Sequence, residues 1–170
     1  VMGVVANIFY LEKGFNVKEI ATYSKFFGVF ATIFGGFVGG ISALKYGTMR
    51  ALFVGALIAA TSNLLFAWLA MSQPSIKFLI IVITADNISS GFAGAAFVVY
   101  LSSLTSIKFT ATQYALFSSI MLFLPKLIAG YSGSWVDVMG YPNFFILTAV
   151  LGIPVLIMIL WISKIAPVKN

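Results

Sequence analysis

Long apolar runs, joined by short loops that hold most of the charges, constrain the fold of this chain more than any other feature. Residues 51–71 and 143–163 contain no charged side chain, and each run is close to the roughly 20 residues that an α-helix needs to cross a bilayer. Only 8% of the 170 residues are charged, whereas a soluble domain has about 25%. The sequence therefore predicts an all-α polytopic membrane protein.

We predict a single transmembrane domain over residues 1–170, with five full spans and the remnant of a sixth. The remnant, residues 1–8, is apolar but too short to cross a bilayer, so it is interpreted as the end of a helix whose beginning is missing. The full spans are predicted at residues 19–44, 51–71, 76–104, 111–135 and 143–163, with a turn at 137–142.

The loop charges predict how these spans are oriented. If the spans alternate, one side holds five basic residues: Lys45, Arg50, Lys108, Lys164 and Lys169. The other side holds three: Lys13, Lys18 and Lys77. Because Lys and Arg are enriched in cytoplasmic loops, the C-terminus is expected in the cytoplasm.

Composition also narrows the chemistry. The chain has no cysteine and no histidine, which excludes disulfides and thiol chemistry and leaves no basis for expecting a metal site. The net charge of +6 is scattered singly along the chain, so membrane lipid is an expected partner and nucleic acid is not. No nucleophile–base pair or cofactor-binding loop is visible, and an enzyme is not expected.

Three charged residues lie inside predicted spans: Lys25, Asp86 and Lys126. Each costs about 2.5–3.5 kcal/mol at a helix centre on insertion scales. At about 1.5 Å per residue, they lie at similar depth on three helices, which would permit ion pairing around a water-filled cavity. Alternatively, each lysine reaches the headgroups and Asp86 is purely structural. The sequence leaves open whether Asp86 is protonated or ion-paired.

Small and polar residues accompany these charges. Ser89 follows Asp86 at helical spacing, and Lys25 shares a helical stripe with Thr32 and Gly36. Two small-xxx-small pairs, Gly35/Gly39 and Gly36/Gly40, predict that their helix approaches a neighbour closely.

The loop after this helix resembles the cytoplasmic loop motif of the major facilitator transporters. Gly40, Lys45, Gly47 and Arg50 fall at the motif's glycine and basic positions, and they are the predicted gating loop. Leu44 stands where the motif has an aspartate, so the acid–base latch of the motif lacks its acid here.

A longer stretch resembles the AmpG-type muropeptide permeases of that superfamily. DNISSGFAGAAFVVYLSSL, which begins at Asp86, and FTATQYALFSS, which begins at Phe109, look like the fourth and fifth helices of the C-terminal half of those carriers. FYLEKGF, which begins at Phe9, looks like their loop after the seventh helix. The family typically has Glu-Asn at Asp86-Asn87 and an arginine at Lys126.

The resemblance implies the C-terminal half of a twelve-helix carrier in the bacterial inner membrane, powered by the proton gradient and needing no cofactor. Its expected solute is an anhydromuropeptide, moved from periplasm to cytoplasm. The expected partner is the missing N-terminal half. The predicted substrate or coupling residues are Asp86 as the coupling acid, Asn87, Gln113, and Lys25 or Lys126 as the partner of a substrate carboxylate.

Two alternatives stay open at this point. One is a major facilitator carrier of another solute. The other is a membrane remnant or partner subunit that does not transport, because the resemblance begins partway through the seventh helix.

Overall fold

The computed structural model describes residues 2–104 and 110–165, and helices account for nearly all of them. In chain order the elements are α1 (Met2–Glu12), α2 (Val17–Tyr23), the π-helical segment η1 (Ser24–Gly28), α3 (Val29–Tyr46), α4 (Thr48–Met71), α5 (Ile76–Leu104), α6 (Thr110–Gly130), α7 (Ser132–Val150) and α8 (Gly152–Ile165). Lys108 and Lys169, which entered the charge count, lie outside the described residues.

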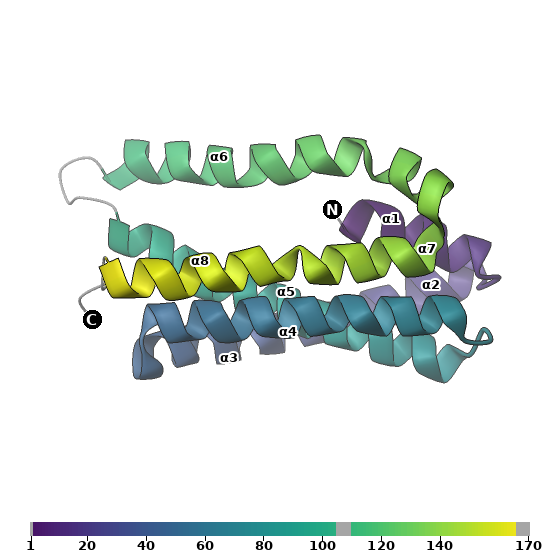
Figure 1. The fold of residues 1–170 in the computed structure, drawn as a ribbon. Coiled ribbons are helices and arrows are strands. Elements are labelled where there is room, and N and C mark those ends of the chain that lie inside the picture. Colours follow the sequence, from purple (N-terminus) through teal and green to yellow (C-terminus); the bar gives the residue numbers. More distant parts are fainter. Residues whose placement is uncertain (1, 105–109, 166–170) are drawn as a thin grey trace.

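Within the described ranges, five helical stretches are long and apolar enough to cross a membrane: Val17–Tyr46, Thr48–Met71, Ile76–Leu104, Ala111–Gly130 and Ser132–Ile165. The longer helices run along one common direction, and the α3–α4 loop lies at the same end of the bundle as the end of α8 (Figure 1). The prediction of an all-α polytopic membrane protein is confirmed.

The last part of the chain differs in detail from the span expected at residues 111–135. The helix breaks after Gly130, at Tyr131, and α7 then continues past Asp137. Its direction reverses at Gly140, whose φ of 75° is readily adopted only by glycine. Beyond this kink, α7 and α8 run back along the bundle toward the end where α6 began (Figure 1).

Helices α3 and α5 make the closest contact in the bundle, and glycine permits it. A Cβ atom on Gly35 would collide with the backbone carbonyl of Ile88, and one on Gly39 would collide with that of Phe92. From the other side, Gly91 of α5 faces the backbone of α3 in the same way. The close approach predicted from the Gly35/Gly39 pair is therefore confirmed.

The second pair, Gly36/Gly40, contributes only Gly36 to this contact, and the prediction is wrong for Gly40. A Cβ on Gly36 would make an ordinary contact at 3.7 Å with the carbonyl oxygen of Gly91. A Cβ on Gly40 would meet nothing within 4 Å. The reason is rotational: Gly35, Gly36 and Gly39 lie on the side of α3 that meets α5, whereas Gly40 is turned away from it.

The most densely packed core lies at the end of the bundle near α1. Phe9, Phe66, Phe144 and Phe145 are almost completely buried there, and the rings of Phe9 and Phe145 meet edge to face with centroids 4.9 Å apart. Edge-to-face pairs of this kind are favourable beyond the area they bury. This cluster holds α1 against α4 and α7.

Lys13, which directly follows α1, stabilises the same end of the bundle. Its ammonium donates a hydrogen bond of 2.6 Å to the carbonyl of Ala70, one of the last four carbonyls of α4, which have no partner inside the helix. The positive charge also suits the C-terminal end of the helix dipole.

Lys13→Met should therefore lower the free energy of unfolding by about 2 kcal/mol, since a hydrogen bond to a charged donor is lost. Thermal or denaturant unfolding in detergent would measure the change. Lys18→Met is the matched control, because the structure shows Lys18 bonded to Asn16 through its backbone N–H. Equal effects of the two substitutions would contradict a capping role for Lys13.

Candidate functional site

A cavity of about 620 Å³ lies between α4, α5 and the segment from α6 to α8. Its polar lining comes mostly from α4 and α5, with one residue from α7, and consists of Ser62, Asn63, Asp86, Asn87, Ser89, Ser90 and Thr148. Polar side chains gathered in an otherwise apolar bundle are expensive in a bilayer and are typical of solute or ion pathways.

Asp86 is placed in this cavity by a pair of serines. The hydroxyl of Ser89 donates to the backbone carbonyl of Asp86 at 2.8 Å. It also lies 3.3 Å from the hydroxyl of Ser62 on α4. Both serines are buried, so this contact holds α4 and α5 together directly beside the carboxylate.

Asn87 joins the cavity to α3. Its side-chain amide donates to the carbonyl of Ile83 at 2.8 Å and its oxygen accepts from the hydroxyl of Thr32 at 2.9 Å. Gly28 leaves room for this amide, because a Cβ there would approach its nitrogen to 3.3 Å. An asparagine side chain has two N–H groups and two oxygen lone pairs. Asn87 can therefore hold α3 and still offer hydrogen bonds to a solute.

Lys25 lies away from this cavity. It is exposed and lines a separate pocket with Asn7, Ser24 and other residues near the start of α2. The predicted stripe with Thr32 assumed a regular α-helix, but Lys25 lies in the π-helical segment η1. A π-helical turn holds more residues than an α-helical one, so the spacing between Lys25 and Thr32 no longer puts them on one face.

The α6 residues are also not brought to Asp86 in this structure. Lys126 is exposed and Gln113 is half-buried, whereas Ile128 is the part of α6 that lines the cavity. Figure 1 shows α6 lying apart from the rest of the bundle, and Ala129 is its only buried residue among the side chains described. The structure therefore joins Asp86 and Asn87 at one cavity, without Lys25, Lys126 or Gln113.

Four polar or aromatic lining residues were not predicted from the sequence: Ser62 and Asn63 on α4, and Trp135 and Thr148 on α7. Asn63 follows Ser62 in the middle of α4, and this polar pair inside a charge-free span was a signal that could have been used. Trp135 lines the cavity from α7. Its placement depends on the break at Tyr131, which lies inside the span predicted at residues 111–135, whereas the reversal at Gly140 falls within the turn predicted at 137–142.

The chemistry available in the cavity is hydrogen bonding around one carboxylate. Hydroxyl and amide groups can bind the polar groups of a solute, the indole of Trp135 offers an apolar surface, and Asp86 can exchange a proton or attract a cation. Within residues 2–104 and 110–165, no group of three or more acidic, cysteine or histidine residues is arranged to hold a metal ion.

No protein-family model matches this chain. Individual relatives do match it along most of its length. "Putative transporter AmpG 4" of Rickettsia felis is 36% identical over 163 residues, 96% of this chain, and the protein of the same name in Rickettsia conorii is 35% identical over 162 residues. "Putative transporter AmpG 1" of Rickettsia prowazekii is 35% identical over 162 residues. The AmpG-type resemblance is confirmed.

The match covers only part of the relatives. This chain spans 39% of the length of the two AmpG 4 proteins and 37% of the AmpG 1 protein. The five apolar helices agree with the relatives' being named transporters, and the chain is a multi-pass membrane protein that is similar to putative AmpG transporters along most of its length.

The residues predicted to form a gating loop make a tight connection between α3 and α4. Gly47 alone separates the two helices, and its φ of 94° explains why a glycine is needed there. Lys45 is exposed, with its ammonium 5.3 Å from the ring centroid of Tyr46. Arg50 is exposed in the first turn of α4, and Gly40 lies within α3. The basic residues of the motif are thus presented at one end of the bundle.

Proposed function

We propose that this chain forms part of a proton-coupled major facilitator carrier that imports anhydromuropeptides from the periplasm. The observation that carries the proposal is the polar cavity around Asp86 within an apolar bundle. The names of the relatives support transport as the activity. We place the protein in the bacterial inner membrane with its C-terminus in the cytoplasm, as the loop charges indicate.

In this proposal each candidate residue has a distinct task. Asp86 takes up and releases the coupled proton, so no cofactor is needed beyond the proton gradient. Asn87 and Asn63 offer hydrogen bonds to the solute from opposite helices, α5 and α4. Lys25, Lys126 and Gln113 contact the solute in another arrangement of the helices, or where the remainder of the carrier faces this half.

The carrier is completed by the part of an AmpG-type protein that this chain does not cover. Secondary transporters of this kind have their solute site between two halves that rock against each other. The proposed partners are thus that remaining part and the surrounding lipid, with the muropeptide as solute.

Uptake of labelled anhydromuropeptide into membrane vesicles tests the proposal. The chain would be produced together with the N-terminal half of an AmpG-type transporter, and uptake would be measured with and without an imposed pH gradient, acidic outside. We expect uptake that needs both parts and the gradient. Uptake of other solutes alone would point to a different carrier, and no uptake with both parts inserted would favour a non-transporting subunit.

Substitutions of Lys126 test whether its positive charge takes part in binding the solute. We expect Lys126→Arg to keep most of the uptake and Lys126→Ala to lose it, because a lysine that holds a substrate carboxylate can be replaced by another cation more readily than by a methyl group. Initial uptake rates at equal protein levels would measure this. Equal rates for the two variants would instead show that Lys126 only extends to the headgroups.

A further inference from the structure

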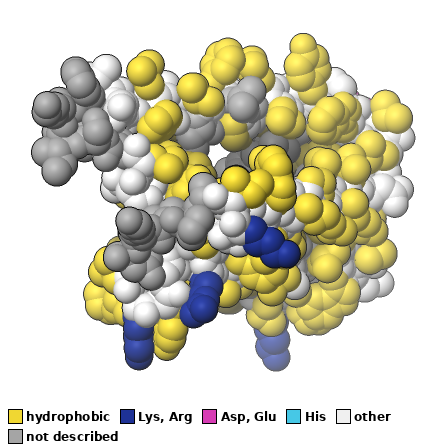
Figure 2. All heavy atoms as spheres, turned by 60° about the vertical axis from the view of Figure 1, so that its left-hand side comes forward, with side chains coloured by type: hydrophobic (Ala, Val, Ile, Leu, Met, Phe, Trp, Pro, Cys, Tyr) yellow, Lys and Arg dark blue, Asp and Glu magenta, His cyan; other side chains and the backbone are white. Residues whose placement is uncertain are grey.

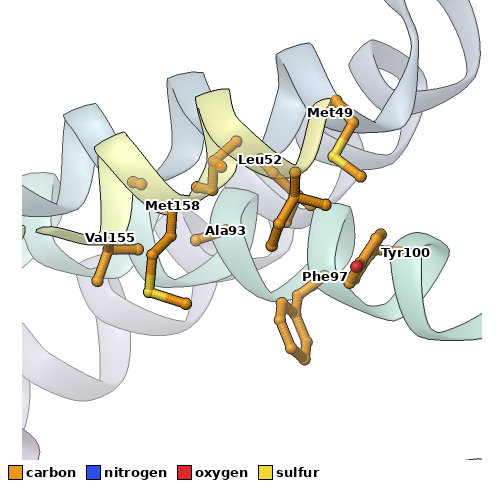
Figure 3. A pocket seen from close by; sticks show the side chains of 10 residues that line it. Met49, Leu52, Ala93, Phe97, Tyr100, Val155 and Met158 are labelled. Carbon is orange, nitrogen blue, oxygen red and sulfur yellow. The ribbon is translucent and has the colours of Figure 1, made fainter. Parts of the chain in front are cut away.

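An apolar pocket of about 400 Å³ lies between α4, α5 and α8, beside the polar cavity. Figure 3 shows side chains from all three helices converging on it, with the Tyr100 hydroxyl as the one oxygen among the labelled side chains. Val155 borders both this pocket and the polar cavity. Apart from Val155, the lining of the apolar pocket differs from that of the polar cavity, because it offers a solute almost no hydrogen bonds.

The shape of this pocket follows the helix axes. Its lining runs from Met49 to Ala56 on α4, from Ala93 to Tyr100 on α5 and from Val155 to Ile162 on α8. Each stretch is about 10 Å long at 1.5 Å per residue, and half of a hydrocarbon core is roughly 15 Å thick. Because the helices cross the bilayer, the pocket extends along the same direction as the acyl chain of a lipid within one leaflet.

A second groove of about 340 Å³ continues this pocket around α4 and α8. The two share Met49 and Ile159. The groove differs in having Arg50 and Ser163 in its lining, together with apolar neighbours such as Phe53. An arginine and a hydroxyl at one end of an apolar groove are the groups that would bind a phosphate attached to a hydrocarbon chain.

The surroundings of Arg50 are positively charged. Lys45 lies in the last turn of α3 and Lys164 in the last turn of α8, at the same end of the bundle. Figure 2, which brings this end forward, shows Lys and Arg side chains but no acidic side chain on the visible face. Clusters of this kind at the cytoplasmic ends of spans attract anionic lipids.

We propose that this end of α4 and α8 binds an anionic phospholipid, with its phosphate at Arg50 and Ser163 and an acyl chain in the apolar pocket. A free phosphate ion would leave the pocket unfilled, and a zwitterionic lipid would leave the basic charge unmatched. The site is independent of the polar cavity and of the solute that the protein carries.

Native mass spectrometry of the full chain, extracted from vesicles of phosphatidylcholine and phosphatidylglycerol in equal parts, tests this proposal. We expect phosphatidylglycerol to be retained in preference to phosphatidylcholine. Arg50→Gln should reduce the retained phosphatidylglycerol by about fivefold, since one basic contact near the headgroup is lost. Ala56→Phe, which fills the pocket, should reduce it without removing any charge.

Two controls keep the test decisive if Ala56→Phe folds poorly. Lys77→Gln removes an exposed charge at the start of α5, at the other end of the bundle, and should leave retention unchanged. Short-chain phosphatidylglycerol should displace the retained lipid, whereas glycerol phosphate should not. Equal retention of the two lipids, or equal losses for Arg50→Gln and Lys77→Gln, would overturn the proposal. Displacement by glycerol phosphate would do so as well, because it would show a headgroup site without an acyl-chain pocket.

Discussion

Gly91→Ala should destabilise the protein by forcing apart the contact between α3 and α5. The new Cβ would collide with the carbonyl of Thr32 and come within 2.9 Å of the backbone nitrogen of Gly36. Both are backbone atoms, so the helices must separate to accommodate it. Overpacking of a tight contact costs about 1–3 kcal/mol, and thermal unfolding in detergent would show a lowered midpoint.

The matched control lies one turn further along α5. A Cβ on Gly94 would meet nothing within 4 Å, so Gly94→Ala should be neutral or raise stability by up to about 1 kcal/mol through helix propensity. The separation caused by Gly91→Ala should also weaken the hydrogen bond between Thr32 and Asn87, and uptake should fall with stability. If both variants unfold at the same temperature, the α3–α5 contact is looser than the structure shows.

Asp86→Asn should abolish proton-driven uptake. An asparagine keeps the size and hydrogen-bonding capacity of the side chain but cannot exchange a proton. Helix packing around the serine pair should be preserved, because Ser89 bonds to the backbone of residue 86 and not to its carboxylate. Solute exchange between the two sides without a gradient should therefore survive in this variant, while accumulation against a concentration difference is lost.

Asp137→Asn is the control for this substitution. Asp137 is exposed and lines a different pocket, near Glu12 and Tyr141. Vesicles with this variant should accumulate solute at the normal rate. Normal accumulation by Asp86→Asn would remove Asp86 from the coupling mechanism, whatever solute the carrier moves.

Part of the fold and part of the candidate site could be predicted from the chemistry of local stretches of the sequence. The length and polarity of the apolar runs predicted the membrane class, since few other structures satisfy the backbone in a bilayer. Asp86 and Asn87 were chosen because their polarity is unusual inside an apolar run, and both line the cavity. Gly35 and Gly39 were recognised from their spacing on a single helix.

The other features of the fold and the site could not be predicted, because they depend on how segments far apart in the sequence meet. The spacing rule that identified Gly35 and Gly39 also identified Gly40, because it cannot tell which face of α3 meets α5. The π-helical segment that turns Lys25 away has no simple spacing signal. Trp135 reaches the cavity because the helix breaks at Tyr131, inside the single span predicted at residues 111–135.

Thiol labelling tests whether the cavity beside Asp86 is a water-accessible solute site. The chain has no cysteine, so Ser90→Cys in the cavity and Ile81→Cys on an exposed, apolar part of α5 provide single reactive groups. We predict that a water-soluble maleimide labels the cysteine at position 90, that anhydromuropeptide slows this labelling, and that the cysteine at position 81 stays unreactive in lipid. Equal reactivity at both positions, with no protection by anhydromuropeptide, would show that the cavity is not a water-accessible solute site.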